Sequence, residues 1–428
     1  MKVPTLVRLI PVALLMMLVV ILIRLYLGLE YAPSGLPDHR IGIRVVNGVG
    51  EFYDRKTNQE FTPRGNNYIR LSQKIENGQT VLYHSTFDSG VYDHARYALS
   101  LSQMHQHGYN VVRVFLNHAA MGAPGGGLSQ PYVANVADFL QLAAQNEVYV
   151  ILTHDWLPDG KYSDELNKEC CTLFDSSNLL RLSRAGAKAY QLFYTDFINA
   201  LDALNARTDA IFSYELNNEL YFDNDRPPLS LPSGLVTAVN FKTYDMSSPA
   251  DKDKMIAESM PYWINSIRGA ILYLDPTALV SVGFMSPHEP SPGDTDQRLS
   301  VSAPAIWDSM ADFIDLHTYL LPADPSDPGQ VMKKEMESFG MIGMLEKPII
   351  MGEFGAEHIL GSSNTAALHL VAWQVESCQF GFDGWMLWTW DLSQTEDPNN
   401  KYFTALDGQG AIDLSLATTS RPDPCSWE

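Results

Sequence analysis

The sequence has few basic residues for its acidic content. Lys and Arg number 29 against 50 Asp and Glu, and the formal net charge is −21. No cluster of Lys and Arg stands out that could release counterions from phosphates, so nucleic acid is excluded as a partner. The same charge disfavours an acidic polymer, and a neutral partner is therefore favoured.

Cysteine is also scarce, with four residues, Cys170, Cys171, Cys378 and Cys425. An even number permits disulfides in an oxidising compartment. A chain of 428 residues can nevertheless bury a sufficient core without them. Adjacent cysteines do not easily bridge each other without strain, so the pairing stays open.

Several motifs of other function classes are missing. There is no Gly-x-Gly-x-x-Gly at the first strand–helix turn for a dinucleotide, and no Gly-x-Ser-x-Gly elbow for a serine hydrolase. His154-Asp155 does not have a zinc-binding spacing, and His317 lacks a second ligand near it in the sequence. The sequence therefore predicts no metal site and no organic cofactor.

One long apolar run stands near the N-terminus. Residues 9–23, LIPVALLMMLVVILI, carry no charge, and the run extended to Leu29 reaches about 20 residues, enough to cross a bilayer. Basic residues precede the run and no good small-x-small cleavage site follows it. We predict a transmembrane anchor over residues 1–30 that leaves the rest of the chain outside the cytoplasm. A cleaved signal segment, and so a secreted protein, is the alternative.

The remaining chain divides by its patterning. Residues 31–60 are predicted to hold a linker and a small β-hairpin, because apolar and polar residues alternate around Gly48 and Gly50. Residues 61–420 are predicted to form one domain, and residues 421–428 a short tail. In that domain, apolar β-type runs alternate with helical stretches; the runs are 62–69, 109–117, 148–156, 211–220, 278–284, 313–320, 347–355 and 384–391. The predicted helices include 90–107, 132–146, 181–206, 252–273, 329–345 and 364–380.

Strands that are apolar almost throughout and alternate with helices indicate a parallel sheet covered by helices. Eight such units predict an α/β fold of the (β/α)₈ or TIM-barrel type, in which functional residues gather at the C-terminal ends of the strands. The side chains at or near these ends are Asn66, Asn67, Arg113, His154, Asn218, Glu219, His317, Tyr319, Glu353 and Trp388. Carboxylates, amides and an indole suit a neutral sugar, through acid/base chemistry, hydroxyl recognition and stacking on the pyranose.

Seven motifs occur in a recognisable order: RGNNY, GYNVVRVFLN, VILTHDW, YELNNEL, FIDLHTY, PIIMGEFG and GWMLWTW. The ordered set resembles glycoside hydrolase family 5 and its relatives in clan A, over about residues 40–420. The resemblance implies a (β/α)₈ enzyme that cleaves β-linked glycosides with retention and needs no cofactor. The substrate is expected to be a β-glucan or a β-mannan, and the protein a monomer.

The resemblance also implies roles for single residues. Glu219 matches the acid/base and Glu353 the nucleophile. Arg113 and Tyr319 would hydrogen-bond the nucleophile, Asn218 the sugar 2-hydroxyl, and Trp388 would form the floor under the sugar. His154 and His317 are further candidates for substrate binding. Leu220 departs from the proline usual after the acid/base, which indicates altered loop geometry.

The two glutamates are expected to titrate differently. Arg113 should keep Glu353 ionised, while repulsion between the carboxylates should raise the pKa of Glu219. Glu215, four residues before Glu219, is expected to be a buried structural carboxylate. Two alternatives use the same barrel: a transglycosylase, which differs only in the acceptor, and a carbohydrate-binding protein that has lost its chemistry.

Overall fold

The computed structural model describes residues 35–76, 79–287, 290, 294–300, 304–319, 327–392, 396–397 and 400–426. The anchor expected over residues 1–30 lies outside this set. Among the helices that the structure describes, none combines the length and the apolar composition that crossing a bilayer requires.

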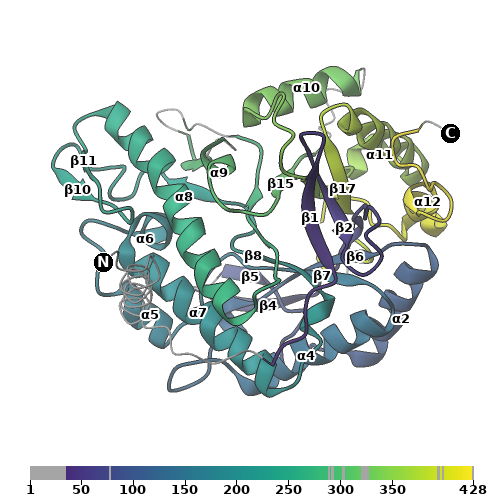
Figure 1. Cartoon of the computed structure of the whole chain (residues 1–428), viewed down its shortest axis with the longest axis horizontal. Helices are drawn as coiled ribbons and strands as arrows, with labels where there is room; N and C mark the ends of the chain where they lie inside the picture. The colour runs from purple at the N-terminus through teal and green to yellow at the C-terminus, as the bar shows by residue number, and fades with distance from the viewer. Residues whose placement is uncertain are drawn as a thin grey trace, which may run out of the picture. The chain divides into compact units, whose positions relative to one another are not determined.

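One parallel sheet forms the centre of the fold (Figure 1). Its strands are β3 (Arg64–Asn67), β6 (Val111–Phe115), β7 (Tyr149–Thr153), β8 (Ile211–Glu215), β12 (Val280–Ser281), β13 (Gly283–Phe284), β15 (Ile314–His317), β16 (Ile349–Phe354) and β17 (Phe382–Leu387). They are hydrogen-bonded in the order β12-β8-β7-β6-β3-β17-β16-β15-β13. Because β12 and β13 are separated only by Val282, the two ends of this order meet and the sheet closes. The predicted (β/α)₈ barrel is confirmed.

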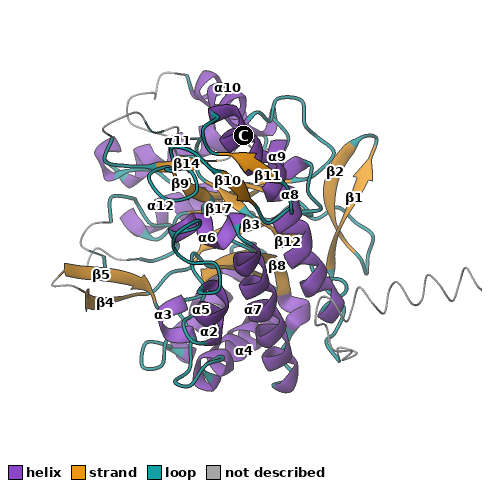
Figure 2. Ribbon diagram, turned by 90° about the vertical axis from the view of Figure 1, so that its left-hand side faces the viewer, coloured by secondary structure: helices purple, strands orange, loops and turns teal. Residues whose placement is uncertain are grey.

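Helices follow the strands and surround them (Figures 1 and 2). The longer ones are α2 (His94–Gln106), α4 (Gln130–Gln145), α7 (Arg184–Ala203), α8 (Pro249–Leu274), α10 (Pro328–Phe339), α11 (Ser363–Cys378) and α12 (Asp407–Leu416). Short helices are α3 (His118–Met121), α5 (Lys161–Leu166), α6 (Ser176–Leu182) and α9 (Pro304–Trp307). The strands are buried on both faces, which explains why their sequences are apolar almost throughout.

Helix α7 shows how the sequence places these helices. Its buried aromatic residues Tyr190, Phe193, Tyr194 and Phe197 recur every three or four positions and so share one face. The helix predicted for 181–206 begins only at Arg184, because Ser183 is extended and its hydroxyl accepts a hydrogen bond from the N–H of Gly186 at 2.8 Å. Ser183 is thus the N-cap.

The predicted hairpin before the barrel is present, as β1 (Ile41–Val46) and β2 (Val49–Asp54). Asn47 and Gly48, both with positive φ, form its two-residue turn, as expected for the Asn-Gly turns that match the twist of paired strands. Phe52 packs against Phe212 and Phe313, with ring centroids 5.1 and 5.3 Å apart. The hairpin therefore covers the N-terminal ends of the barrel strands.

Three strand pairs were not predicted, and all lie in loops that follow barrel strands. They are β4 (Leu71–Glu76) with β5 (Gln79–His84), β9 (Tyr221–Asp223) with β14 (Arg298–Ser300), and β10 (Leu235–Thr237) with β11 (Thr243–Asp245). Figure 2 shows the β4–β5 hairpin on the opposite side of the barrel from β1–β2. These pairs belong to the C-terminal face of the barrel.

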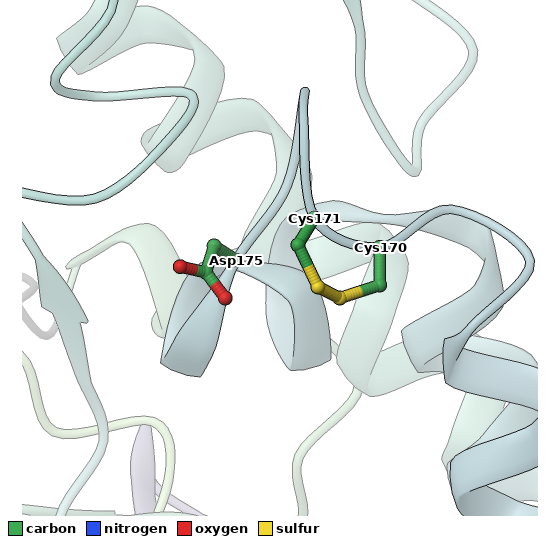
Figure 3. Close-up of side chains that lie close together, drawn as sticks. All are labelled: Cys170, Cys171 and Asp175. Atoms are coloured by element: carbon green, nitrogen blue, oxygen red, sulfur yellow. A yellow bond between two sulfur atoms is a disulfide. The ribbon is translucent and has the colours of Figure 1, made fainter.

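The cysteines, whose pairing the sequence left open, form two disulfides. Cys378 at the end of α11 is joined to Cys425 and ties the C-terminal segment to the barrel. Cys170 is joined to its neighbour Cys171, beside Asp175, the N-cap of α6 (Figure 3).

Candidate active site

Arg113 of β6 lies at the centre of the candidate site and is completely buried. Its guanidinium donates to Asn67 Oδ1 at 3.0 Å, Glu353 Oε1 at 2.7 Å, Glu215 Oε1 at 2.6 Å and Asn218 Oδ1 at 2.7 Å. These partners come from β3, β16, β8 and the turn after β8. Arg113 therefore connects β6 to three other barrel strands near their C-terminal ends.

Glu353, in β16, has both carboxylate oxygens bonded to donors. Arg113 binds one, and the hydroxyl of Tyr319 donates to the other at 2.6 Å. Burial raises the pKa of Glu353, and the positive charges of His317 and Arg113 only partly offset it. Arg113 thus favours the ionised form of Glu353, in the direction expected, but burial outweighs it and the net shift of the pKa is upward.

Glu219 follows β8, and its side chain is 27% exposed. Its Oε1 lies 3.1 Å from Nδ1 of His317. Burial raises the pKa of Glu219, but the His317 hydrogen bond and the charges of His317, Arg113 and Arg298 outweigh burial and lower it. The expected upward shift is therefore wrong. Burial, with a smaller contribution from the repulsion between the carboxylates, raises the pKa of Glu353 instead.

The two glutamates lie close together, with His317 between them. One carboxylate oxygen of each and a ring nitrogen of His317 all lie within 4.8 Å of one another. Such a group could hold a metal ion, which the spacing in the sequence did not reveal. Arg113 and Tyr319 bond the two oxygens of Glu353, and the charge of the guanidinium would repel a cation held beside it.

Two other groups have the ligand types of a metal site within the described residues: Cys170, Cys171 and Asp175, and Glu215, Asp315 and His317. The sulfur atoms of the first are joined in a disulfide, whereas zinc binds thiolates. The second lies deeper in the barrel than Glu219 and Glu353. It is completely buried, as expected for Glu215.

Asn218 is held from both sides. Its Oδ1 accepts from Arg113, and its amide is hydrogen-bonded to Asp155, whose pKa burial raises to about 6. A backbone hydrogen bond explains why Leu220 stands where the family usually has proline: the N–H of Leu220 donates to the carbonyl of Gly283 at 3.0 Å. Proline has no N–H and could not make this bond.

His154 is placed away from the site. Its ring is fully buried against Tyr190 and Phe193 of α7, with Nε2 3.1 Å from the Tyr194 hydroxyl and Nδ1 3.3 Å from the Trp156 carbonyl. Burial lowers its pKa to about 4. With both nitrogens occupied by protein groups, the imidazole has no atom left for the substrate contact predicted from the sequence. It supports the site through its backbone, since its carbonyl accepts from the N–H of Asn218.

Trp388 is half-buried beyond the end of β17, edge-on to Phe115 and His84. With His84, Tyr402 and the apolar side chains of Ile69, Leu71, Leu82 and Leu392, it lines a pocket of about 330 Å³. His84 was not predicted; it comes from the β4–β5 hairpin and stacks on Phe115 with ring centroids 4.0 Å apart. Burial lowers the pKa of His84 to about 4.

Two glycines make room for the site and were also missed. A Cβ on Gly352 would overlap the carboxyl group of Asp315, and one on Gly283 would overlap the carbonyl of Asn218. Glycine inside an apolar strand run signals such a close approach. Both stand in predicted strands, so this signal was available.

Comparison with known proteins gives a family and a fold. The family profile described as "Cellulase (glycosyl hydrolase family 5)" matches residues 75–394, three quarters of the chain. The search of curated proteins found no match.

Solved structures with a similar fold include enzymes named for action on mannans or mannosides. An endo-1,4-β-mannanase from Rhizomucor miehei is 16% identical, with a TM-score of 0.60 over 89% of this chain and 98% of that one. An exo-β-1,4-mannosidase from an Opitutaceae bacterium is 15% identical, with a TM-score of 0.56 over 90% and 63%. A β-mannanase from the blue mussel Mytilus edulis is 17% identical, with a TM-score of 0.51 over 91% and 99%.

Proposed function

Because the chain belongs to glycosyl hydrolase family 5 and is thus a glycosyl hydrolase, we propose that it cleaves β-mannosidic bonds with retention of configuration. The observation that carries retention is the short separation of Glu219 and Glu353, whose nearest ligand oxygens lie within 4.8 Å. Retaining enzymes keep their two carboxyl groups about 5–5.5 Å apart, whereas inverting enzymes need about 6.5–9.5 Å to admit a water molecule.

In the first step, Glu353 Oε attacks the anomeric carbon while Glu219 donates its proton to the leaving oxygen. Glu219 is the more exposed of the pair, which suits contact with the leaving group and with water. Without sugar, burial raises the pKa of Glu353, whereas the hydrogen bond and charge of His317 outweigh burial and lower the pKa of Glu219. Substrate binding therefore has to raise the pKa of Glu219 before this residue can act as the acid.

In the second step, Glu219 removes a proton from water, which attacks the glycosyl–Glu353 ester and restores the first configuration. Arg113 and the hydroxyl of Tyr319 hold the carboxylate of Glu353 in place through both steps. His317 orients Glu219. We assign Asn218, which Arg113 holds in position, to the sugar 2-hydroxyl, and Trp388 to stacking against the pyranose.

The choice of mannan over glucan is supported by the names of the structural neighbours, which are β-mannanases and a β-mannosidase. We expect residues 31–428 to cleave β-1,4-linked manno-oligosaccharides with a kcat/KM about tenfold or more above that for cello-oligosaccharides, a difference of about 1.4 kcal/mol. Proton NMR during hydrolysis should show the β-anomer appearing first. Initial release of the α-anomer would refute retention, and faster cleavage of cello-oligosaccharides would refute the mannan assignment.

We also propose that residues 1–30 anchor the protein in a membrane, with the catalytic barrel outside the cytoplasm, on the strength of the apolar run at 9–23. The whole chain should remain in the membrane pellet after alkaline carbonate extraction, and residues 31–428 should be soluble. As a matched control, a full-length Leu15→Arg, Val19→Arg variant should leave the membrane, since each arginine costs about 2.5–3.5 kcal/mol at the centre of a span. Mature protein trimmed near residue 30 and found in the medium would show a cleaved signal instead.

A further inference from the structure

A buried group of charges lies around Arg113 and includes the proposed nucleophile, Glu353. It contains three carboxyl groups, on Glu215, Asp315 and Glu353, and one arginine, Arg113. Glu215 and Asp315 are 0% exposed and Glu353 is 4% exposed. Three ionised carboxylates around one guanidinium would leave uncompensated negative charge in the interior, which is costly. At least one of the three is therefore expected to hold a proton.

The contacts of Arg113 identify which carboxyl that is. The guanidinium bonds Glu353 at 2.7 Å and Glu215 at 2.6 Å, and both of these pairs are buried. Neither oxygen of Asp315 accepts a hydrogen bond from an N–H group or a hydroxyl among the described residues. Asp315 lies against Gly352, next to Glu215, with Nε2 of His317 3.8 Å from its Oδ1. Of the three carboxyl groups, Asp315 is thus the one without a hydrogen bond to Arg113. Nε2 of His317 lies beyond hydrogen-bond distance from it, and its neighbour is the carboxyl of Glu215.

We propose that Asp315 is a neutral carboxylic acid whose O–H donates to Glu215, so that Arg113 is shared by only two carboxylates, Glu215 and Glu353. A carboxyl-to-carboxyl hydrogen bond requires that one partner keep its proton, and it satisfies the otherwise unpartnered oxygens Glu215 Oε2 and Asp315 Oδ. Burial and the charge of Glu215 raise the pKa of Asp315 well above its ordinary value. The pKa of Glu215 is lowered despite burial, through Arg113 and the hydrogen bond with Asp315.

In this arrangement Asp315 is a positioning residue for the proposed nucleophile. An ionised Asp315 would add a negative charge near Glu353 and compete for Arg113, and it would raise the pKa of Glu353 further. The nucleophile would then be protonated over more of the working pH range. The proton on Asp315 prevents this, and it leaves Glu215 as the counter-charge of Arg113 while Glu353 is esterified.

The first test uses stability and needs no assumption about the reaction. A carboxyl whose folded pKa is raised contributes stability below its unfolded pKa, about 3.9 for Asp, and loses that contribution as pH rises through the folded value. Asp315→Asn has no proton to lose, but its amide can still donate to Glu215. The Tm of this variant minus that of the wild type should therefore increase steadily from pH 5 to pH 8. A difference that stays constant, or falls, over this range would refute the neutral acid.

The second test uses activity and therefore rests on the proposed role of Glu353. The kcat/KM of Asp315→Asn should be about tenfold or more higher than that of Asp315→Ala, because the alanine leaves Glu215 without its hydrogen-bond donor. The acidic limb of the pH profile, which reports Glu353, should not move in the Asn variant. If Asp315 is ionised, Asp315→Asn removes a negative charge and shifts that limb to lower pH, which would overturn the proposal.

Two measurements remain informative if a variant does not fold. The infrared spectrum of the wild-type protein in D₂O at pH 8 should contain the carbonyl stretch of a protonated carboxylic acid, also in a Glu353→Gln background. Absence of this band would refute the proposal. Elemental analysis should detect no stoichiometric divalent metal, since an ion bound by Glu215, Asp315 and His317 would replace the shared proton.

Discussion

Glu353→Ala is expected to abolish turnover on every substrate, with kcat falling by about 10⁴-fold or more, as for other covalent nucleophiles. Without this carboxylate no glycosyl–enzyme can form, whatever the quality of the leaving group. The loss should be measured on an unactivated manno-oligosaccharide and on an aryl β-mannoside. An aryl mannoside that is still turned over at near wild-type rate would show that another residue is the nucleophile.

Glu357→Ala provides the matched control for this loss. Glu357 lies four residues further along the same segment but forms an ion pair with Lys401 at 2.6 Å, away from Arg113. Its replacement should leave most of the activity in place. Both variants should show cooperative thermal unfolding, which separates a lost nucleophile from a lost fold. Glu353→Ala removes the cost of burying a carboxylate, but it also removes one ion-pair partner of Arg113. A modest fall in Tm is therefore compatible with the assignment.

The barrel could be predicted because parallel strands buried on both faces leave long apolar runs in the sequence. The β4–β5 hairpin was missed, although its Asn77-Gly78 dipeptide between alternating residues is a hairpin signal. Because the hairpin was missed, His84 was not predicted as a site residue, although it lines the pocket beside Trp388.

His154 was wrongly predicted to contact the substrate, because its position at a strand end was taken as sufficient evidence for a site residue. Along β7, Ile151 packs in the barrel interior, whereas Val150 and Leu152 pack in the outer core with the helices. Side chains alternate along a strand, so His154 shares the outward direction of Leu152. The period of two predicts this, and the ring indeed packs on α7.

The charge balance of the site could not be predicted from the sequence. It depends on how deeply each carboxyl is buried and on which cations lie next to it. Glu215 and Glu219 share a strand and its following turn, yet only Glu215 contacts Arg113, while Glu219 contacts His317 from β15. These distances follow from the closure of the barrel and are not encoded in the spacing along one strand.

Glu219→Ala is expected to separate the two steps of the reaction. Unactivated manno-oligosaccharides need a proton on the leaving oxygen, so their kcat/KM should fall by about 10²–10⁴-fold. A dinitrophenyl β-mannoside needs no such proton. It should still form the glycosyl–Glu353 intermediate, which then persists for want of a base. This should appear as a burst of dinitrophenolate and as a mass increase of the intact protein.

Azide added to Glu219→Ala should restore turnover of the dinitrophenyl mannoside, because azide is anionic and attacks without a base. It reaches the anomeric carbon from the side opposite Glu353, so two successive inversions give a β-mannosyl azide. Glu353→Ala is the control, since any azide product there arises by one direct displacement and has the α-configuration. An α-azide from Glu219→Ala would contradict the assignment of Glu219, as would equal loss on the activated and unactivated substrates. The expected products would show that both displacements at the anomeric carbon, first by Glu353 and then by azide, take place in the space between Glu219 and Glu353.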